Sequence, residues 1–525
     1  MLGIAAIVSK LLGTLQKIPL QNLAGEEAFG IYNVVYPLYT FILTLAIAGL
    51  PLTVSAFVSE ARALGRPGEP RRVLRTAAIV LGVTGLLCFL LLYFGADGLA
   101  SWLGVPKTAA AIRSVSWALL LAPVMAALRG YFQGFGDMTP TAISQVAEQL
   151  VRVAAMLGLL LAFLHLGYGP ERIAAGATFG STAGAAAGLL VMLGYWRRRR
   201  PDLPPEGTSR QRAASLPAEP TGAFVRRFLA AAVPVCLGSM ALPLLTLVDS
   251  ATLPRLLGGE GFAEQARLHA VGLYNHAQPL VQLVALIATS MTAALVPAIA
   301  EARAAGRADQ VARRTELSVR FAWLIGLAAS FGLAASAKPI NIMMFTSPEG
   351  TRTMAILAFT AAFSTLQIVS GSVLIGLGAA KRPALHLFAA ALVKLALNAL
   401  LVPRAGIEGA AIAAVVAYAL AAGANLAALT RLTGVRFGTA TYLARPFVAV
   451  LAMVAAVLAI RIGLLGLGGG RSAASLTALA AVVTGAVVYV AALFRTGAVT
   501  RADASALPGG SSRLVPWLER LRLLR

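Results

Sequence analysis

The sequence contains few charged residues, cysteines or histidines for its length. Only 12% of the 525 residues are charged, whereas 58% are hydrophobic and the mean hydropathy is +0.80. Soluble domains carry about 25% charged residues, so this composition excludes an ordinary soluble enzyme. The two cysteines, Cys88 and Cys236, lie in apolar runs, and the four histidines are scattered. Neither residue type shows disulfide or metal-ligand spacing, and we expect no cofactor and no metal.

Apolar runs of about 20 residues, the length that crosses the hydrocarbon layer as a helix, recur along the whole chain. They predict an all-α, polytopic membrane protein. Fourteen helices are expected, at residues 2–18, 29–58, 73–95, 109–128, 140–164, 173–195, 228–250, 271–300, 317–337, 353–378, 384–402, 407–430, 443–465 and 473–494.

The positive charges lie mainly on one side of these predicted helices. The net charge of +23 could indicate nucleic-acid binding, but of the 44 Lys and Arg residues 30 fall in one set of alternating loops and 11 in the other. This asymmetry places both termini in the cytoplasm, at the plasma membrane of a bacterium, and leaves nucleic acid out as a partner. Lys10, Arg152 and Lys394 instead fall inside apolar helices, where a charge is costly and usually faces a wet cavity.

A segment rich in Arg and Pro divides the chain. Residues 196–227 read as a cytoplasmic linker between six helices and eight. The predicted organisation is a first lobe at 1–195, the linker, a second lobe at 228–430, two further helices at 431–494 and a cytoplasmic tail at 495–525 that contains a short amphipathic helix.

The two lobes share an internal repeat. GIYNVVYPL from Gly30 aligns with GLYNHAQPL from Gly272 at an offset of 242, and EARALGR from Glu60 aligns with EARAAGR from Glu301 at 241. At an offset of 242, Gly134 and Gly136 fall on Gly376 and Gly378, and Arg152 falls on Lys394. Because six helices separate the copies, the repeat is parallel. It predicts two lobes related by a pseudo-twofold axis along the membrane normal, with a cavity between them.

Two prolines lie well inside the repeated segments. Pro37 and Pro279 each remove a backbone hydrogen bond and bend a helix. They are hinge candidates, and a fixed kink that improves packing is the alternative.

Several stretches carry a resemblance to a known family. They are SKLLG from Ser9, KIPL from Lys17, GIYNVVYPLY from Gly30 and RGYFQGFGDMTPTAISQVAEQLVRV from Arg129 to Val153. In these the chain resembles the stage V sporulation protein B branch of the polysaccharide exporters, which is related to the lipid II flippase MurJ. The resemblance covers essentially the whole chain. It implies the MOP-superfamily fold, with two six-helix lobes and two extra helices, and the export of an undecaprenyl-pyrophosphate-linked precursor such as lipid II.

Carrying a pyrophosphate across hydrocarbon requires cations in the cavity. The available ones are Lys10 and Lys17 on the first helix, with Arg152 and Lys394 in the two lobes, and relatives have basic residues at matching places on the first helix. Where MurJ relatives have arginines on the second and eighth helices, this chain has amides and an imidazole that can hydrogen-bond a sugar or phosphate. These residues are Asn33, Asn275 and His276.

Each of these residues also has a structural interpretation. Glu148 and Arg152 are spaced i,i+4, which predicts an ion pair within one helix, with direct substrate contact as the alternative. Lys17 could extend to the membrane surface. His276 could be a hydrogen-bonded helix residue or a proton sensor. Asp249 is a weak candidate for an ion site, with an interfacial role as the alternative.

The function that follows is transport without enzymatic chemistry. The expected partners are an anionic polyprenyl-pyrophosphate lipid, membrane lipids and the cell-wall synthesis machinery, and the protein is expected to be a monomer. Export of another lipid-linked oligosaccharide, such as an O-antigen or capsule unit, and multidrug cation antiport are the transport alternatives. Two alternatives come from other classes of protein. A membrane glycosyltransferase would need clusters of acidic residues or histidines in large loops. A structural scaffold would keep its function when the buried cations are mutated. The sequence contains no nucleotide-binding G-x-x-x-x-G-K-[ST] loop, so we expect an ion gradient or the membrane potential to drive transport.

Overall fold

The fold is all-helical in the residues that the computed structural model describes, namely 2–47, 49–64, 69–198, 221–435, 437–438, 440–464, 470–500 and 503. The chain forms two compact units, Met1–Gly272 and Leu273–Arg525. The predicted amphipathic helix of the tail and most of the predicted linker lie outside the described residues.

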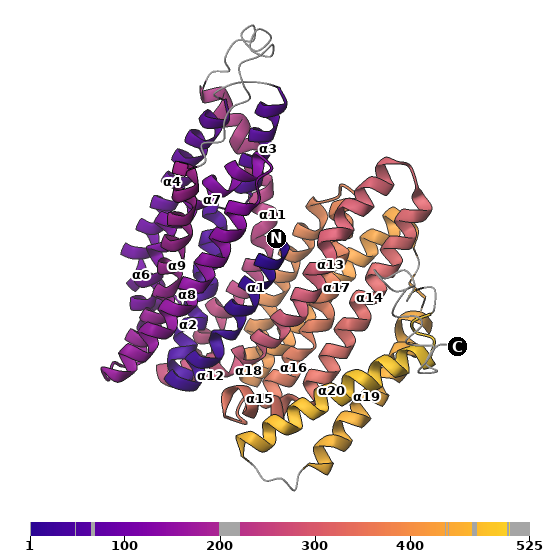
Figure 1. Ribbon diagram of the computed structural model, residues 1–525. Coiled ribbons are helices and arrows are strands. Elements are labelled where there is room, and N and C mark those ends of the chain that lie inside the picture. Colours follow the sequence, from indigo (N-terminus) through magenta and orange to yellow (C-terminus); the bar gives the residue numbers. More distant parts are fainter. Residues whose placement is uncertain are drawn as a thin grey trace. The chain divides into compact units, whose positions relative to one another are not determined.

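Unit 1 contains ten α-helices and one 3₁₀ helix within its described part, and an eleventh α-helix, α12, ends just across the unit boundary (Figure 1). In chain order these are α1 (Leu2–Leu15), α2 (Lys17–Ile47), α3 (Leu50–Ala63), α4 (Glu69–Phe94), α5 (Ala96–Trp102), η1 (Pro106–Thr108), α6 (Ala109–Ser116), α7 (Ala118–Gly134), α8 (Thr139–His165), α9 (Pro170–Arg198), α11 (Thr221–Gly259) and α12 (Glu264–Tyr274).

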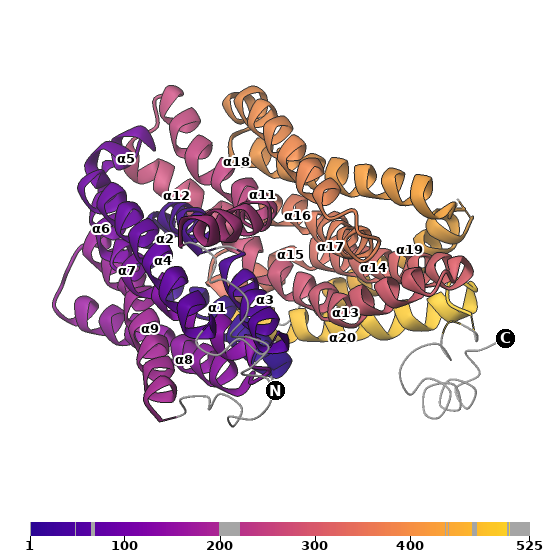
Figure 2. The same ribbon diagram turned by 90° about the horizontal axis from the view of Figure 1, so that it is seen from above.

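Unit 2 begins at the end of α12, and its last two long helices, α19 and α20, lie side by side (Figures 1 and 2). Its elements are η2 (Asn275–Ala277), α13 (Gln278–Ala304), α14 (Ala308–Ala335), α15 (Ala337–Phe345), α16 (Thr351–Ala358), α17 (Thr360–Gly376), α18 (Lys381–Thr433), the π-helical turn η3 (Ala440–Ala444), α19 (Arg445–Gly463) and α20 (Arg471–Arg495).

Twelve helices in the described part are long and apolar enough to span a membrane, and two of these, Leu11–Ala63 and Lys381–Thr433, have 53 residues each. A straight helix of that length would reach about 80 Å, more than twice the hydrocarbon thickness. Glycines break both, with φ of 78° at Gly25 and 54° at Gly406. The first break reverses the chain, because Lys17 Nζ lies 3.4 Å from Asn33 Oδ1.

The second long helix also folds back on itself. A Cβ atom on Gly409 would lie 2.5 Å from the carbonyl oxygen of Leu401, eight residues earlier, which a continuous helix would hold about 12 Å away. Each 53-residue segment is therefore a hairpin of two membrane-spanning helices. Counted in this way, the twelve candidates contain the fourteen predicted spans, and the prediction of a multi-pass all-α membrane protein is confirmed.

The repeat predicted at an offset of 241–242 is present in the packing of each unit. In unit 1, a Cβ on Gly134 of α7 would lie 2.5 Å from the Cβ of Val58 on α3. In unit 2, a Cβ on Gly376 of α17 would lie 3.0 Å from the Cβ of Ile299 on α13. These two residue pairs are equivalent in the repeat, so the same glycine-mediated crossing occurs twice. The pseudo-twofold relation between the lobes stays a prediction.

A second equivalence concerns a helix break that the sequence analysis did not predict. The regular α-helical hydrogen bonding is interrupted at Trp117, between α6 and α7, and again at Phe359, between α16 and α17, although both residues keep right-handed helical backbone angles. These positions are 242 residues apart. The spans predicted at 109–128 and 353–378 are thus each made of two stacked helices.

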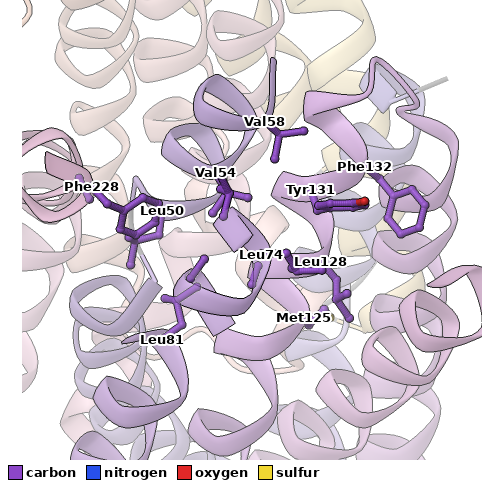
Figure 3. Packing of buried hydrophobic residues seen from close by; sticks show 14 of the residues in the cluster. Leu50, Val54, Val58, Leu74, Leu81, Met125, Leu128, Tyr131, Phe132 and Phe228 are labelled. Atoms are coloured by element: carbon purple, nitrogen blue, oxygen red, sulfur yellow. The ribbon is translucent and has the colours of Figure 1, made fainter. Parts of the chain in front are cut away.

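The core of unit 1 shows which helices belong together (Figure 3). Leu50, Val54 and Val58 of α3 meet side chains of α4 and α7. Phe228 of α11 is fully buried in the same cluster. The seventh span therefore packs with unit 1 in the structure, whereas the expected second lobe begins at residue 228. The helices also extend into the predicted linker, because α9 ends at Arg198 and α11 begins at Thr221.

A row of glycines brings α8 and α9 into close contact. Gly176, Gly180, Gly184 and Gly188 recur every fourth residue on α9. A Cβ on Gly180 or Gly184 would lie within 2.7 Å of a backbone carbonyl oxygen of α8. Small residues at this spacing allow membrane helices to approach backbone to backbone. The row fixes the position of α8, which carries Glu148 and Arg152.

Candidate functional site

The hairpin at Gly25 brings Lys17 and Asn33 together inside unit 1. Both side chains are buried, and Lys17 Nζ lies 3.4 Å from Asn33 Oδ1. The Asn33 amide is oriented for this contact because its Nδ2 donates to the carbonyl oxygen of Phe29 at 2.8 Å. Lys17 is 6% exposed, so its side chain does not extend to a surface of the unit.

Tyrosines of α2 surround this lysine. Lys17 Nζ lies 5.9 Å from the ring centroid of Tyr36, within the range of a cation–π contact. The Tyr36 ring stacks on Tyr32 with a centroid separation of 5.3 Å, and the Tyr32 hydroxyl accepts a hydrogen bond from Gln16 Nε2 at 3.5 Å. The ammonium therefore lies among neutral acceptors and aromatic rings.

Glu148 on α8 is shared by two arginines. Arg152, four residues later, donates from Nη2 to Glu148 Oε1 at 2.8 Å, which confirms the predicted ion pair. Arg129 of α7 donates from its own Nη2 to the other carboxylate oxygen at 2.9 Å. Arg129 also donates to Ser144 Oγ, which in turn donates to the carbonyl oxygen of Gly188 at 3.0 Å. All three charged side chains are about five-sixths buried, so the network belongs to the interior of unit 1.

The two groups together carry excess positive charge. Lys17, Arg129 and Arg152 carry three positive charges, and Glu148 balances one of them. Arg152 also interacts electrostatically with Tyr36, which links the network to the aromatic group around Lys17. Nε of Arg152 and Nε2 of Gln149 are buried donors without a hydrogen-bond partner among the described residues. This arrangement can bind an anion through charge and hydrogen bonds.

The predicted site residues of unit 2 have different surroundings. Lys394 is buried in the first arm of α18. His276 is fully buried, its Nδ1 lies 2.8 Å from Asn341 Oδ1, and its ring stacks on Phe345. The interpretation of His276 as a hydrogen-bonded structural residue therefore fits its environment. Asn275 begins the 3₁₀ turn η2 directly before it.

The two hinge candidates are not equivalent. Pro37 lies in the interior of α2, as predicted. Pro279 lies in the first turn of α13, directly after η2, where proline is readily accommodated because its missing N–H would have no intrahelical partner. The bend in this span is thus a break before Pro279. Asp249 is buried on α11. Lys10 lies in α1, and its side chain falls outside the described residues.

Sequence analysis missed Arg129, which we counted among the loop cations. It lies inside α7, and its position within the Arg129–Val153 motif was the available signal. The tyrosines at 32, 36 and 39 were also missed, although their spacing places them along one side of a helix. Within the described residues, no group of three or more His, Cys, Asp or Glu side chains is arranged to hold a metal ion.

The sequence matches the models of two known protein families. Residues 1–303 match the family described as polysaccharide biosynthesis protein, and residues 234–400 match the MatE family. The first match covers more than half of the sequence. The chain belongs to the polysaccharide biosynthesis protein family.

Three proteins of Bacillus subtilis (strain 168) are similar to this chain over most of their length. The chain is 32% identical over 517 residues to an uncharacterized membrane protein, YabM, covering 97% of this chain and 94% of that protein. It is 29% identical over 434 residues to the lipid II flippase MurJ, covering 79% of each chain. It is 28% identical to the stage V sporulation protein B, covering 79% of this chain and 80% of that protein. The resemblance found in the sequence is thus confirmed.

Solved structures of the MOP superfamily share the fold. The lipid II flippase MurJ in an inward closed conformation aligns with a TM-score of 0.68 at 13% identity, covering 93% of this chain and 97% of that one. An inward-facing multidrug resistance MATE family transporter aligns with a TM-score of 0.65 at 15% identity, covering 83% and 98%. At these identities the likeness establishes the fold, and the prediction of a MOP-type membrane fold is confirmed.

Proposed function

We propose that this protein is a flippase that moves an undecaprenyl-pyrophosphate-linked cell-wall precursor, with lipid II as the first candidate, from the inner to the outer leaflet. The observation that carries the proposal is the excess positive charge of two neighbouring groups in unit 1, Lys17 with its neutral partners and Arg129 and Arg152 around Glu148, in a chain of the polysaccharide biosynthesis protein family. A pyrophosphate needs charge-assisted hydrogen bonds to leave water, and arginine and lysine supply them.

The roles that we assign follow from the contacts. Lys17 is surrounded by neutral acceptors, so its charge remains available to an anion. Arg152 keeps one contact to Glu148 and presents its Nε as a further donor. Asn33 orients Lys17, and Glu148 holds Arg129 and Arg152 in place. In unit 2, Lys394 with Asn275 and His276 is the proposed counterpart, and Lys10 is a further cation of the first span. Pro37 and Pro279 remain hinge candidates, and Asp249 a weak ion-site candidate.

Two other transport functions use the same fold. Export of an O-antigen or capsule unit would need the same cation chemistry, because the carrier lipid is also a polyprenyl pyrophosphate. Multidrug cation antiport is favoured by the MatE match over residues 234–400. An antiporter of cations needs carboxylates at its site, whereas the Lys17 group and the network around Glu148 carry mainly positive charge. This polarity favours an anionic substrate.

The setting of the proposed activity follows from the charge asymmetry of the loops. We place the protein in the bacterial plasma membrane with both termini in the cytoplasm, working as a monomer by alternating access without catalysing a chemical reaction. An ion gradient or the membrane potential supplies the energy. The cell-wall synthesis machinery is the proposed partner.

The test replaces the resident lipid II flippase of a bacterium with this protein and scores outer-leaflet lipid II with an externally added probe. Wild type should restore the signal. Lys10→Ala, Lys17→Ala and Lys394→Ala should each abolish it without loss of protein from the membrane. The conservative variant Lys17→Arg should retain part of the activity, because the charge is kept.

The matched control is Arg113→Ala, whose guanidinium pairs with Asp97 at an exposed position away from the site. It should transport as well as wild type. Full transport by all three alanine variants would refute the cation mechanism. A wild-type protein that reaches the membrane but fails to restore the signal would refute lipid II as the substrate and favour another lipid-linked saccharide.

A further inference from the structure

Unit 2 contains an apolar cavity of about 300 Å³ that lies apart from the proposed site residues. Its walls come from α14, α17, the second arm of α18 and the segment that leads into α19. The lining residues are Val319, Trp323, Phe363, Leu366, Ala419, Ala422, Gly423, Leu426, Phe437, Tyr442 and Leu443. The cavity lies beside a buried hydrophobic cluster and opens past the exposed residues Gly423 and Leu443.

The polar groups of the wall are already bonded elsewhere. Trp323 donates from Nε1 to the carbonyl oxygen of Tyr442 at 2.7 Å, and the Tyr442 hydroxyl donates to the carbonyl oxygen of Glu316 at 3.2 Å. These two bonds fix both rings as rigid walls. They also leave hydrocarbon and aromatic surface facing the cavity.

The wall of this cavity is too apolar to hold ordered water. Its volume is that of about ten water molecules, but buried water needs two to four polar partners each, which this wall does not offer. The chain spans a membrane, so the abundant molecule that can fill the cavity from the side is a lipid hydrocarbon chain.

Arginines lie close in sequence to the lining residues, and one of them, Arg445, also donates from Nη1 to the carbonyl oxygen of Gly497 at 3.1 Å. Arg431 follows Leu426 by five residues on α18, and Arg445 follows Leu443 by two. The side chains of Arg431 and Arg445 are exposed, and so is that of Arg313 on α14. One exposed acidic residue, Glu316, lies between Arg313 and Val319 in the sequence. Basic side chains next to a membrane surface attract anionic lipid head groups at about 1 kcal/mol each.

We propose that this cavity is a binding site for an acyl chain of an anionic membrane phospholipid, with the head group held by Arg431 and Arg445. The bound lipid packs between α14 and α18 and completes the wall of unit 2. The site binds a resident lipid and takes no part in the export that we propose above.

Trp323 provides the probe, because it forms part of the wall. The full-length protein is reconstituted in bilayers that contain phosphatidylglycerol with brominated acyl chains, or phosphatidylcholine with the same chains. Bromine quenches indole fluorescence on contact. The part of the signal that belongs to Trp323 is the difference between wild type and Trp323→Phe.

Gly423 allows the cavity to be filled by mutation. A Cβ on this residue meets nothing within 4 Å, so a leucine there would occupy the space. The graded variants are Gly423→Ala and Gly423→Leu. Gly158→Leu on α8 is the matched control, since its Cβ also meets nothing within 4 Å and it lies in the other unit.

For wild type and Gly158→Leu, quenching of Trp323 should saturate within the first few mole per cent of brominated phosphatidylglycerol. Several-fold more phosphatidylcholine should be needed. Gly423→Leu should lose the saturating phase and Gly423→Ala should retain it, which keeps the test decisive if the leucine variant folds poorly.

Two results would overturn the proposal. Quenching that rises in proportion to the brominated fraction, with no head-group preference and no change in Gly423→Leu, would show ordinary contact with bulk lipid. Displacement of brominated phosphatidylglycerol by undecaprenyl pyrophosphate at a lower mole fraction would assign the cavity to the tail of a transported lipid. Neither readout depends on export activity.

Discussion

The two units repeat the same helix crossing and surround it with different chemistry. Gly134 meets Val58 in unit 1, and Gly376 meets Ile299 at the equivalent place in unit 2. Next to the first crossing lies the charged network of Arg129, Glu148 and Arg152. The repeat therefore preserves backbone packing, which depends on small residues, while the polar residues around it differ between the units.

The corresponding region of unit 2 keeps one cation and lacks the carboxylate, because Lys394 falls on Arg152, whereas Ala390 falls on Glu148 and Gly371 on Arg129. His386, which falls on Ser144 in the repeat, holds its Nδ1 2.7 Å from Asn425 Oδ1. Asn425 in turn donates from Nδ2 to the hydroxyl oxygen of Ser370 at 3.1 Å and to the carbonyl oxygen of Gln367 at 3.2 Å. An amide and imidazole network thus replaces the ion pairs. The comparison teaches that substrate chemistry must be assigned to each unit from its own residues.

Removing the carboxylate of unit 1 should have the largest effect on stability. Glu148→Ala leaves two buried arginines without a counter-charge, which costs about 3–5 kcal/mol for a buried pair. We expect a clear fall in the thermal unfolding midpoint of the detergent-purified protein. Replacing Glu148, Arg129 and Arg152 together by methionine should restore stability and abolish transport, because this change removes the three charges together.

An unfolding midpoint of Glu148→Ala equal to that of wild type would contradict the burial of the network. Transport by the triple methionine variant would show that the charges are dispensable for export.

Adding a Cβ at the glycine crossing that both units share should have the next largest effect on stability. In Gly134→Ala, the added Cβ would lie 2.5 Å from Val58 Cβ, and in Gly376→Ala it would lie 3.0 Å from Ile299 Cβ. Overpacking of this kind costs about 1–3 kcal/mol, and we expect the larger loss for Gly134→Ala. Thermal unfolding of the two variants measures the difference. Gly158→Ala, which adds a Cβ in open space, should be neutral or stabilising, and a loss there equal to that of Gly134→Ala would remove the steric explanation.

The smallest effect concerns an ion pair that unit 2 alone shows. Arg320 on α14 pairs with Asp503, while the repeat offset of 241 places the exposed Ile79 at the position of Arg320. Burial alone would raise the pKa of the Asp503 carboxyl, but hydrogen bonds from Thr500 and the Arg320 guanidinium outweigh it and hold the pKa below its usual value.

Because the pKa of Asp503 is lower in the folded state, its contribution to stability is present above the unfolded pKa of about 3.9 and is lost as the pH falls through the folded value. Asn keeps the size of the side chain and can still accept hydrogen bonds from Thr500 and Arg320. We therefore expect Asp503→Asn to be less stable than wild type at neutral pH by about 1 kcal/mol, and the two unfolding midpoints to converge in acid. A difference that stays constant down to pH 3 would show that the charge of Asp503 does not contribute.

The spans were predictable because the thickness of the hydrocarbon layer fixes their length. Residues 140–164 were predicted for the helix Thr139–His165, and 473–494 for Arg471–Arg495. The turns at Gly25 and Gly406 fall between predicted helices, where a residue that tolerates positive φ was available. By contrast, the breaks at Trp117 and Phe359 fall inside apolar runs, and hydropathy does not detect them.

The candidate site was only partly predictable. The spacing of Glu148 and Arg152 on one helix was sufficient to predict their ion pair. Arg129 belongs to the same network through a contact between different helices, and no local pattern reports such a contact. The same limit applies to Lys17 and Asn33, which the sequence separates by 16 residues and the hairpin at Gly25 brings together.

The glycine row of α9 has a consequence for how the protein is made. Only four residues separate the end of α8 at His165 from the start of α9 at Pro170, so the two helices emerge from the ribosome in succession and can pair at once. Glu148 and Arg152 neutralise each other within α8 and enter the membrane as one neutral unit. Arg129, on the preceding helix, gains its carboxylate only when α7 packs against this hairpin. Assembly of unit 1 therefore includes a packing step at which Arg129 gains its counter-charge.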